Sequence, residues 1–299
     1  MAPRPARSIA PAERNVLYHI PKELTEGPLR RLGEGIGKVV YASERWVVHR
    51  ERSPTEMVAL ILLWRALRKL ERLLPGTWGK RLRDRPSRQI RFLRVLAQGA
   101  ILVFPRALWF PAHIRGILRT YHRRSVRGEK LAQTHLAGSE LLPKRIAFPP
   151  ARVRIGGWPG WLVVSEAAER VETTLHQKMV RLAAEDRFDE LEHWLDQLLE
   201  RRREGWRLGL FSLDAHLKNY GAIGDRIVLL DTGGLTNRWA EVEQRLEAEE
   251  SMAPPHVRLG LGDLLADHSE IAQRFDARWR AAINTAVVRA CWPDRGALP

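Results

Sequence analysis

The spacing of apolar positions changes along the chain, and the expected secondary structure changes with it. Residues 29–48, LRRLGEGIGKVVYASERWVV, hold two β-rich runs around short turns, which predicts a pair of hairpins. Residues 53–56, Ser-Pro-Thr-Glu, predict a helix start with serine as N-cap, proline at the first helical position and glutamate at the third. The helix should end at the Pro-Gly pair 75–76. Its apolar side chains recur at helical spacing and are Met57, Leu60, Ile61, Trp64, Leu67 and Leu70.

Further along the chain, strands give way to helices. Residues 153–166, VRIGGWPGWLVVSE, predict a strand, a Gly/Pro turn and a second, very apolar strand. Residues 227–230 predict a short buried strand, and the chain beyond 237 is expected to be helical with a break at 253–262. This order predicts an α+β protein with two lobes. Residues 188–203 predict an amphipathic helix whose apolar face carries Leu191, Trp194, Leu195 and Leu198.

Composition narrows the class of protein. The 299 residues suffice for one large domain or two lobes. The single cysteine, Cys291, excludes an internal disulfide and is typical of a reducing compartment. The N-terminus lacks the apolar region of a secretory signal, and no run of eighteen apolar residues is present. These features predict a cytoplasmic protein, with a peripheral membrane position as an alternative raised by its charge.

The net charge of +15 is concentrated in one segment. Between Trp78 and Lys130 there are fourteen Lys or Arg residues and two acids, Asp84 and Glu129. Such a field indicates an anionic partner. The wider stretch 78–140 is expected to form several helices broken near two prolines.

The stretch with the strongest chemical signal is residues 211–234, FSLDAHLKNYGAIGDRIVLLDTGG. Asp214, Asn219 and Asp231 flank short apolar runs there. Such residues often do no more than form turns, and Asp-x-Gly ends many strands. The pair of motifs at this spacing, with a buried strand between them and an amphipathic helix before them, favours a functional site instead.

The order of these elements resembles the protein-kinase-like superfamily. Asp214-Ala215-His216-Leu217-Lys218-Asn219 is similar to the catalytic loop "D-L-H-P-x-N" of aminoglycoside- and choline-kinase-like enzymes, and residues 231–233, Asp-Thr-Gly, to their metal-binding "D-x-G". Lipopolysaccharide-kinase-like families are plausible neighbours. The resemblance extends from about 29 to 236, and it implies a bilobal fold with a small β-rich N-lobe and a mainly helical C-lobe.

The resemblance implies an ATP–Mg²⁺-dependent phosphotransferase whose acceptor is a hydroxyl of a small molecule, a glycan or a lipid-linked compound. Phosphoryl transfer needs positioning and cations that spread charge, and Mg²⁺ prefers oxygen ligands. Asp231 and Asn219 are the expected metal ligands. Asp214 is the expected base that orients the acceptor hydroxyl, with His216 beside it as a positive or donor group.

The nucleotide is expected to bind mainly to residues in the N-terminal part of the chain. Residues 33–41 resemble a G-x-G-x-x-G-x-V hairpin with a lysine at the third glycine position, and the backbone of such a hairpin can cover phosphates. Tight hairpins need glycines for other reasons too. The lysine usual on the third strand is absent, which leaves two candidate cations, with Lys38 preferred over Arg50. Glu56 could pair with the cation or only cap its helix, and Glu166 lies in an expected hinge at 165–168. The expected nucleotide-binding residues are Gly33, Gly35, Gly37, Lys38, Arg50, Glu56 and Glu166.

The expected organisation is a tail (1–28), an N-lobe with a basic insertion (29–166) and a C-lobe (167–299). Two departures from the family, Ser212 in place of a bracing His and the absent third-strand lysine, keep a catalytically impaired pseudokinase, acting as scaffold or regulator, as the alternative. No "A-P-E" follows Asp231, which argues against a protein-kinase activation segment. A third hypothesis is a basic peripheral membrane protein in which the kinase-like lobe is incidental.

The basic segment admits three interpretations. It could lie on an anionic membrane surface or contact a lipid-like acceptor, with aromatic side chains inserted and arginines on phosphates. It could simply pack its apolar face on the protein and leave its arginines solvated. Nucleic acid is the least favoured partner, because no nucleic-acid motif is recognisable and the apolar content exceeds what phosphate tracking needs.

Overall fold

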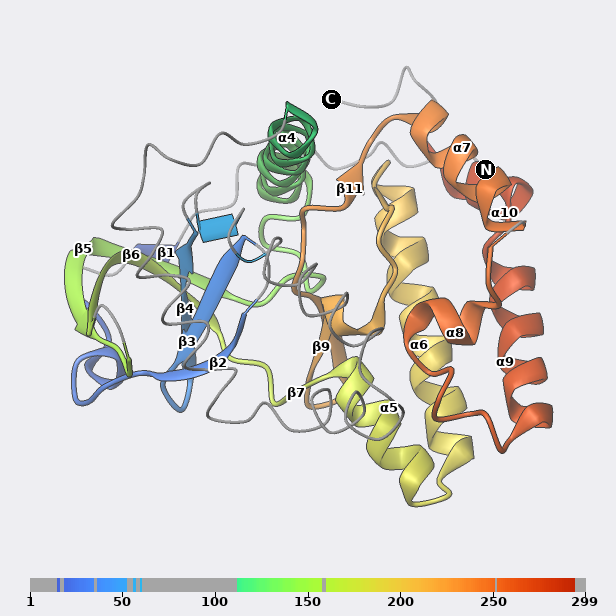
Figure 1. The fold of residues 1–299 in the computed structure, drawn as a ribbon, viewed down its shortest axis with the longest axis horizontal. Coiled ribbons are helices and arrows are strands. Elements are labelled where there is room, and N and C mark those ends of the chain that lie inside the picture. Colours follow the sequence, from blue (N-terminus) through green and yellow to red (C-terminus); the bar gives the residue numbers. More distant parts are fainter. Residues whose placement is uncertain are drawn as a thin grey trace, which may run out of the picture. The chain divides into compact units, whose positions relative to one another are not determined.

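The computed structural model of the chain is a mixed α+β structure (Figure 1). Among the residues that it describes, no helix combines the length and the apolar character needed to cross a membrane. The described residues are 15–16, 19–34, 37–52, 56–57, 60, 112–157, 160–250 and 252–293.

The chain divides into two compact units, and helix α4 (Ala112–His135) contributes its first half to one and its second half to the other. The division after Ala167 lies one residue from the lobe boundary expected at 166/167. The sheet unit is defined as Leu17–His122 with Ala147–Ala167, and the helical unit as Met1–Val16, Arg123–Ile146 and Ala168–Pro299.

One six-stranded sheet, with strand order β1-β5-β6-β4-β3-β2, has most of its residues in the sheet unit. Strand β1, the first residues of β5 and the last residues of β6 fall in the helical unit. Strands β2, β3 and β4 form two consecutive antiparallel hairpins, as the sequence predicts, with an irregularity between Arg31 and Gly33. Residues on one face are buried alternately, Val39 and Tyr41 on β3 and Val48 on β4, as a half-buried sheet requires. The elements are β1 (Asn15–Val16), a 3₁₀ turn (Lys22–Leu24), β2 (Arg30–Glu34), β3 (Lys38–Ala42), β4 (Trp46–Glu51), β5 (Arg145–Arg154) and β6 (Trp161–Glu169).

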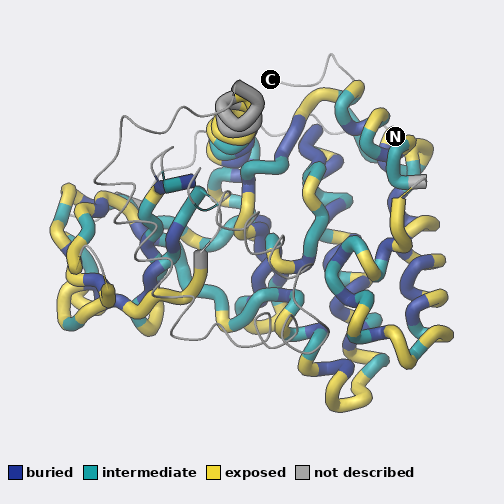
Figure 2. The backbone as a smooth tube through the Cα atoms, in the orientation of Figure 1, coloured by how far each residue is buried: buried dark blue, intermediate teal, exposed yellow. Residues whose placement is uncertain are grey.

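Helices surround two small sheets in the helical unit. Thr174 caps α5 in a reciprocal capping box with Gln177, and α6 and α9 alternate buried and exposed residues along their length (Figure 2). The elements are β7 (Thr173–Thr174), α5 (Leu175–Ala184), α6 (Phe188–Arg207), β8 (Phe211–Ser212), a 3₁₀ turn (Leu217–Asn219), β9 (Tyr220–Ile223), β10 (Arg226–Leu229), β11 (Leu235–Thr236), α7 (Trp239–Glu250), α8 (Pro255–Leu259), α9 (Ser269–Ala282) and α10 (Thr285–Cys291).

Two expectations about elements need correction. Strand β5 begins at Arg145, whereas the sequence predicted a strand only from Val153. Pro149 and Pro150 hid the start of β5 in the sequence, because proline cannot donate a hydrogen bond to a neighbouring strand. The strand tolerates them because its neighbour on one side, β1, is only two residues long, so few hydrogen bonds are lost there. The break expected at 253–262 contains the short helix α8, which has a proline at its start and Gly260 in the left-handed region at its end.

Several predictions concern residues outside the described ranges. These are the helix start at 53–55, the Pro-Gly end at 75–76, most of the basic segment before 112, and Gly35. The described part of the basic segment, from Ala112 on, is one continuous helix as far as His135.

Candidate functional site

The β9–β10 hairpin brings two of the three expected site residues together. Its register pairs Tyr220 with Leu229, so the residues just outside the hairpin face each other. The backbone oxygen of Asn219 accepts hydrogen bonds from Leu230 N at 2.8 Å and from Asp231 N at 3.4 Å. The stretch between the two motifs is therefore an apolar hairpin, and its closure places Asn219 beside Asp231.

A second short ladder brings in the third residue. Strands β8 and β11 pair Ser212 with Leu235, and Leu213 N donates to Gly234 O at 2.9 Å. A Cβ at Gly234 would lie 3.2 Å from Asp214 N, closer than most side chains tolerate. The glycine thus allows Asp214 to approach the segment that follows Asp231.

Hydrogen bonds inside the loops fix the orientation of the polar side chains. Asp214 Oδ1 accepts from His216 N at 3.3 Å, and Asn219 Nδ2 donates to Asp214 O at 3.3 Å. Asp231 Oδ1 accepts from Gly233 N at 2.9 Å. Within the described residues, Oδ2 of both aspartates has no hydrogen bond, and both side chains are exposed.

The donor set of this cluster is two carboxylates and one amide, all oxygen ligands of the kind that Mg²⁺ accepts. Among the described residues, no group of three or more His, Cys, Asp or Glu side chains is arranged to hold a metal ion by itself. A divalent ion here would therefore need further oxygens from water or from a phosphate.

Helix α4 packs directly on the Asp-Thr-Gly loop within the helical unit. Gly128 lies so close to it that an added Cβ would be 1.9 Å from Thr232 O. The next residue, Glu129, accepts a hydrogen bond from Thr232 Oγ1 at 2.7 Å with one carboxylate oxygen and pairs with Arg145 at 2.6 Å through the other. The loop that carries Asp231 is therefore held from the helix side by a polar contact and by close backbone packing.

A second set of contacts, the Arg127 clamp, begins at the residue before Gly128 on α4. Arg127 donates to both carboxylate oxygens of Glu241 at 2.9 Å and also to Thr236 Oγ1, which itself donates to Glu241 at 2.7 Å. These hydrogen bonds, first the one from Arg127, lower the pKa of Glu241 from 4.5 to about 2. Arg127 belongs to the basic segment. At least one positive charge of that segment is therefore paired with an acid of the protein itself.

The clamp predicts an acid-sensitive contribution to stability. The pKa of Glu241 is depressed in the folded protein, so its contribution is complete above pH 4.5 and disappears as the pH falls towards 2. Glu241→Gln should cost about 1–2 kcal/mol at pH 7, since the pair is partly exposed, and almost nothing near pH 2. Urea unfolding at both pH values measures this, with the exposed Glu247→Gln on the same helix as control; an equal loss at both pH values would contradict it.

The surroundings of His216 disfavour the protonated, charged form of its imidazole ring. Its Nδ1 accepts from Lys218 N at 3.1 Å, and its ring edge faces Gly260, where an added Cβ would lie 2.7 Å from Cε1. His176 lies against the same turn, with Nε2 donating to Gly260 O at 2.9 Å. Burial, and then Lys218 and His176, lower the pKa of His216, so at neutral pH it is an uncharged donor through Nε2.

In the sheet unit, Gly37 lies against helix α4. A Cβ at Gly37 would be 3.1 Å from the Tyr121 ring, so the aromatic side chain lies directly against this glycine. Gly33 lies on β2 with open space beside it. Lys38 begins β3, opposite Glu51, and no described side chain bonds to its ammonium group.

Arg50 and Glu56 form a bidentate ion pair with distances of 3.0 and 2.9 Å. The hydrogen bonds that Arg50 donates to Glu56 raise the pKa of Arg50 above its ordinary value. The acid that was expected to pair with a cation therefore pairs with Arg50 and not with Lys38. Glu166 is exposed near the end of β6, next to the division between the units.

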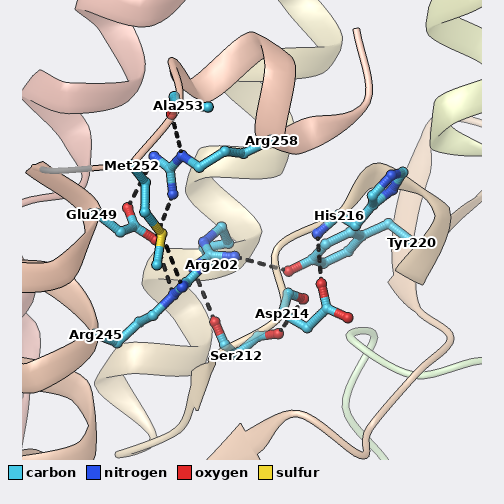
Figure 3. A network of polar contacts seen from close by, with 10 residues as sticks. All are labelled: Arg202, Ser212, Asp214, His216, Tyr220, Arg245, Glu249, Met252, Ala253 and Arg258. Atoms are coloured by element: carbon cyan, nitrogen blue, oxygen red, sulfur yellow. Dashed lines mark hydrogen bonds and ion pairs between the residues drawn. The ribbon is translucent and has the colours of Figure 1, made fainter. Parts of the chain in front are cut away.

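Arg202 is a residue that the sequence analysis missed. It lies on the buried face of α6 and bonds to both sides of the Asp214 loop, at Ser212 and Tyr220 (Figure 3). Its signal was present in the sequence, because Arg202 falls at helical spacing from Leu195 and Leu198, where an apolar residue is expected.

Comparison with protein-family models, with curated proteins and with solved structures gave no match in any of the three.

Proposed function

We propose that the chain is an ATP–Mg²⁺-dependent phosphotransferase of a bilobal, kinase-like kind, acting on a hydroxyl of a small-molecule, glycan or lipid-linked acceptor. The observation that carries the proposal is the convergence of Asp214, Asn219 and Asp231 through two separate short ladders. Closure of the ladders brings these positions together, and a phosphoryl-transfer site accounts for what they carry, because it requires oxygen ligands and an acceptor-orienting carboxylate in one place.

Each residue has a role that its geometry supports. Asp231 and Asn219 would hold Mg²⁺, which when bound would neutralise negative charge on a phosphate. Asp231 uses Oδ1 for Gly233 N and keeps Oδ2 for a ligand. Asp214 similarly keeps Oδ2, with which it would orient the acceptor hydroxyl and take its proton.

The β-rich and mainly helical units support a bilobal arrangement, because they divide next to the expected hinge at 165–168. The sheet unit also supplies a cation held by an acid, Arg50 with Glu56, in a protein that lacks a third-strand lysine. Lys38 remains the second candidate for contact with the phosphates. We infer that Arg50 is the better placed of the two, because Glu56 fixes its guanidinium.

The described part of the basic segment supports an anionic or lipid-linked acceptor. Arg123, Arg124 and Lys130 are exposed on α4, and Val126 between them is 55% exposed. A helix surface with cations around an apolar side chain suits an interface with anionic lipid.

The test is Mg²⁺-dependent nucleotide binding and turnover. ATP with Mg²⁺ should raise the melting temperature more than ATP with a chelator, and ATP should be consumed with one member of an acceptor panel of sugars, small alcohols and lipid-linked glycans in neutral or anionic vesicles. Mg²⁺-dependent binding without turnover would identify the pseudokinase alternative. The absence of both effects would overturn the proposal.

A further inference from the structure

Arg202 is buried in the helical unit without an acidic partner. Its exposed fraction is 6%, and no carboxylate of the described residues lies within ion-pair distance of its guanidinium. The guanidinium carbon lies 5.2 Å from the ring centre of Phe211 and 5.4 Å from that of Trp279, while Nε has no hydrogen-bond partner. The rings offset part of the cost of burying this charge, but such a residue is an expensive choice for packing alone.

The hydrogen bonds of Arg202 reach both ends of the loop that carries Asp214. Nη2 donates to Ser212 O at 3.4 Å, two residues before Asp214, and Nη1 donates to Tyr220 OH at 3.1 Å, after Asn219 (Figure 3). From Ser212 the connection continues, because its Oγ donates to Asp214 O at 2.8 Å. Asn219 Nδ2 donates to the same carbonyl oxygen.

Packing holds the middle of this loop, where Leu217 is fully buried in the core, but the two ends of the loop border a cavity. Ser212 and Tyr220 border a cavity that Arg202 also lines, and its other walls are mainly apolar side chains. The two guanidinium bonds therefore support the ends of the loop beside this cavity, in addition to the β8–β11 ladder at Ser212. The apolar walls include Leu136, Leu141, Trp206 and Leu229.

We propose that Arg202 is a positioning residue that fixes residues 212–220 and thereby sets the orientation of Asp214 for phosphoryl transfer. The inference rests on the proposed function as far as turnover is concerned. In this arrangement, an arginine from α6 acts as a brace for the loop.

The experiment compares Arg202→Met with Arg203→Met, a neighbour on α6 that is partly exposed and pairs with Glu200. Methionine fills the apolar surroundings and removes an unpaired buried charge, so the melting temperature of Arg202→Met should be equal to or above that of the wild type. Turnover should fall about 10²-fold with KM for ATP unchanged, since a small misplacement of the base has that effect. Arg203→Met should leave turnover unchanged.

Amide hydrogen exchange gives a readout that does not need turnover. His216 N, Lys218 N and Asn219 N are bonded inside the loop and should exchange faster in Arg202→Met, whereas Leu229 N, bonded to Leu141 O, should not change. Tyr220→Phe removes one of the two bonds without a change in charge and should accelerate the same loop amides to a smaller degree.

The two proposals fail in different ways. The wild type could show no turnover while the loop amides exchange faster in Arg202→Met and Tyr220→Phe. The proposed function would then be wrong, and the role of Arg202 as a brace for the loop would be confirmed. Unchanged loop exchange in Tyr220→Phe and Arg202→Met overturns the brace, whatever the turnover. Unfolding of Arg202→Met would also overturn it, because the arginine would then be needed for the fold as a whole.

Discussion

Alanine at Gly128 is expected to destabilise the helical unit by about 3 kcal/mol or more, at the upper end of what overpacking costs. The new Cβ would lie 1.9 Å from the backbone oxygen of Thr232 and 2.9 Å from its carbon. No side-chain rotation can relieve a clash with backbone, so either α4 or the Asp-Thr-Gly loop must move. In a unit of this size the melting temperature should fall by roughly 6–12 °C.

The matched control for this change lies on the same helix. Gly116 is exposed, and an added Cβ there meets nothing within 4 Å. Gly116→Ala should therefore stabilise slightly, by about 0.5–1 kcal/mol, because alanine is the better helix former. Melting curves of both variants test the arrangement. If Gly128→Ala melted like Gly116→Ala, α4 would not be packed on the loop as described.

The Gly128 contact also links helix position to chemistry. Thr232 lies next to Asp231, and Glu129 holds its hydroxyl. Asn219 O accepts backbone hydrogen bonds from Leu230 N at 2.8 Å and from Asp231 N at 3.4 Å. A shift of the loop by a fraction of an ångström would stretch these bonds and move Asp231 relative to Asn219. Gly128→Ala should therefore reduce any Mg²⁺-dependent binding more than its loss of stability accounts for.

Local patterns predicted the elements that depend on neighbouring residues. The two hairpins of β2, β3 and β4, the helix α6 and the strand β10 follow from periodicity and turn residues, and all are present. The same patterns underestimated β5, where two prolines interrupt the strand signal. They also missed β9, because its pairing with β10 depends on the turn at Gly224 and not on a run of β-branched residues.

Long-range contacts were beyond local patterns. The Glu129–Thr232 and Arg127–Glu241 bonds join residues more than a hundred positions apart, and no spacing rule foretells them. Arg127 was predicted only as part of a basic field, yet its charge is paired internally. The proximity of Asn219 and Asp231 was easier to predict, because the two residues flank a short hairpin. Asp214 joins them through a ladder that pairs Ser212 with the distant Leu235.

Asp231→Asn is expected to abolish Mg²⁺-dependent ATP binding and to lower turnover by at least about 10³-fold. Asparagine keeps the Oδ1 acceptor for Gly233 N, so the loop should remain in place and the melting temperature should barely change. The loss would follow from the missing charge, since a neutral amide binds Mg²⁺ far more weakly than a carboxylate. Thermal shift with ATP, with and without Mg²⁺, measures the binding.

Asp214→Asn distinguishes the role proposed for Asp214, a base, from that proposed for Asp231, a metal ligand. Its amide oxygen can still accept from His216 N, so the loop is preserved. Without a base for the acceptor proton, kcat should fall by about 10²–10⁴-fold, while the Mg²⁺-dependent thermal shift stays at the wild-type value. The exposed turn residue Asp225, in the hairpin between the motifs, provides the control, and Asp225→Asn should change neither quantity.

The pattern across the three variants decides the assignment. Loss of binding in Asp214→Asn with binding retained in Asp231→Asn would exchange the two roles. Equal turnover in all three would remove both aspartates from the chemistry and leave their convergence unexplained. The expected combination, binding lost only in Asp231→Asn and kcat lost in both Asp214→Asn and Asp231→Asn, requires one residue to hold the metal and the other to act on the acceptor. Three turn-forming side chains would not produce it.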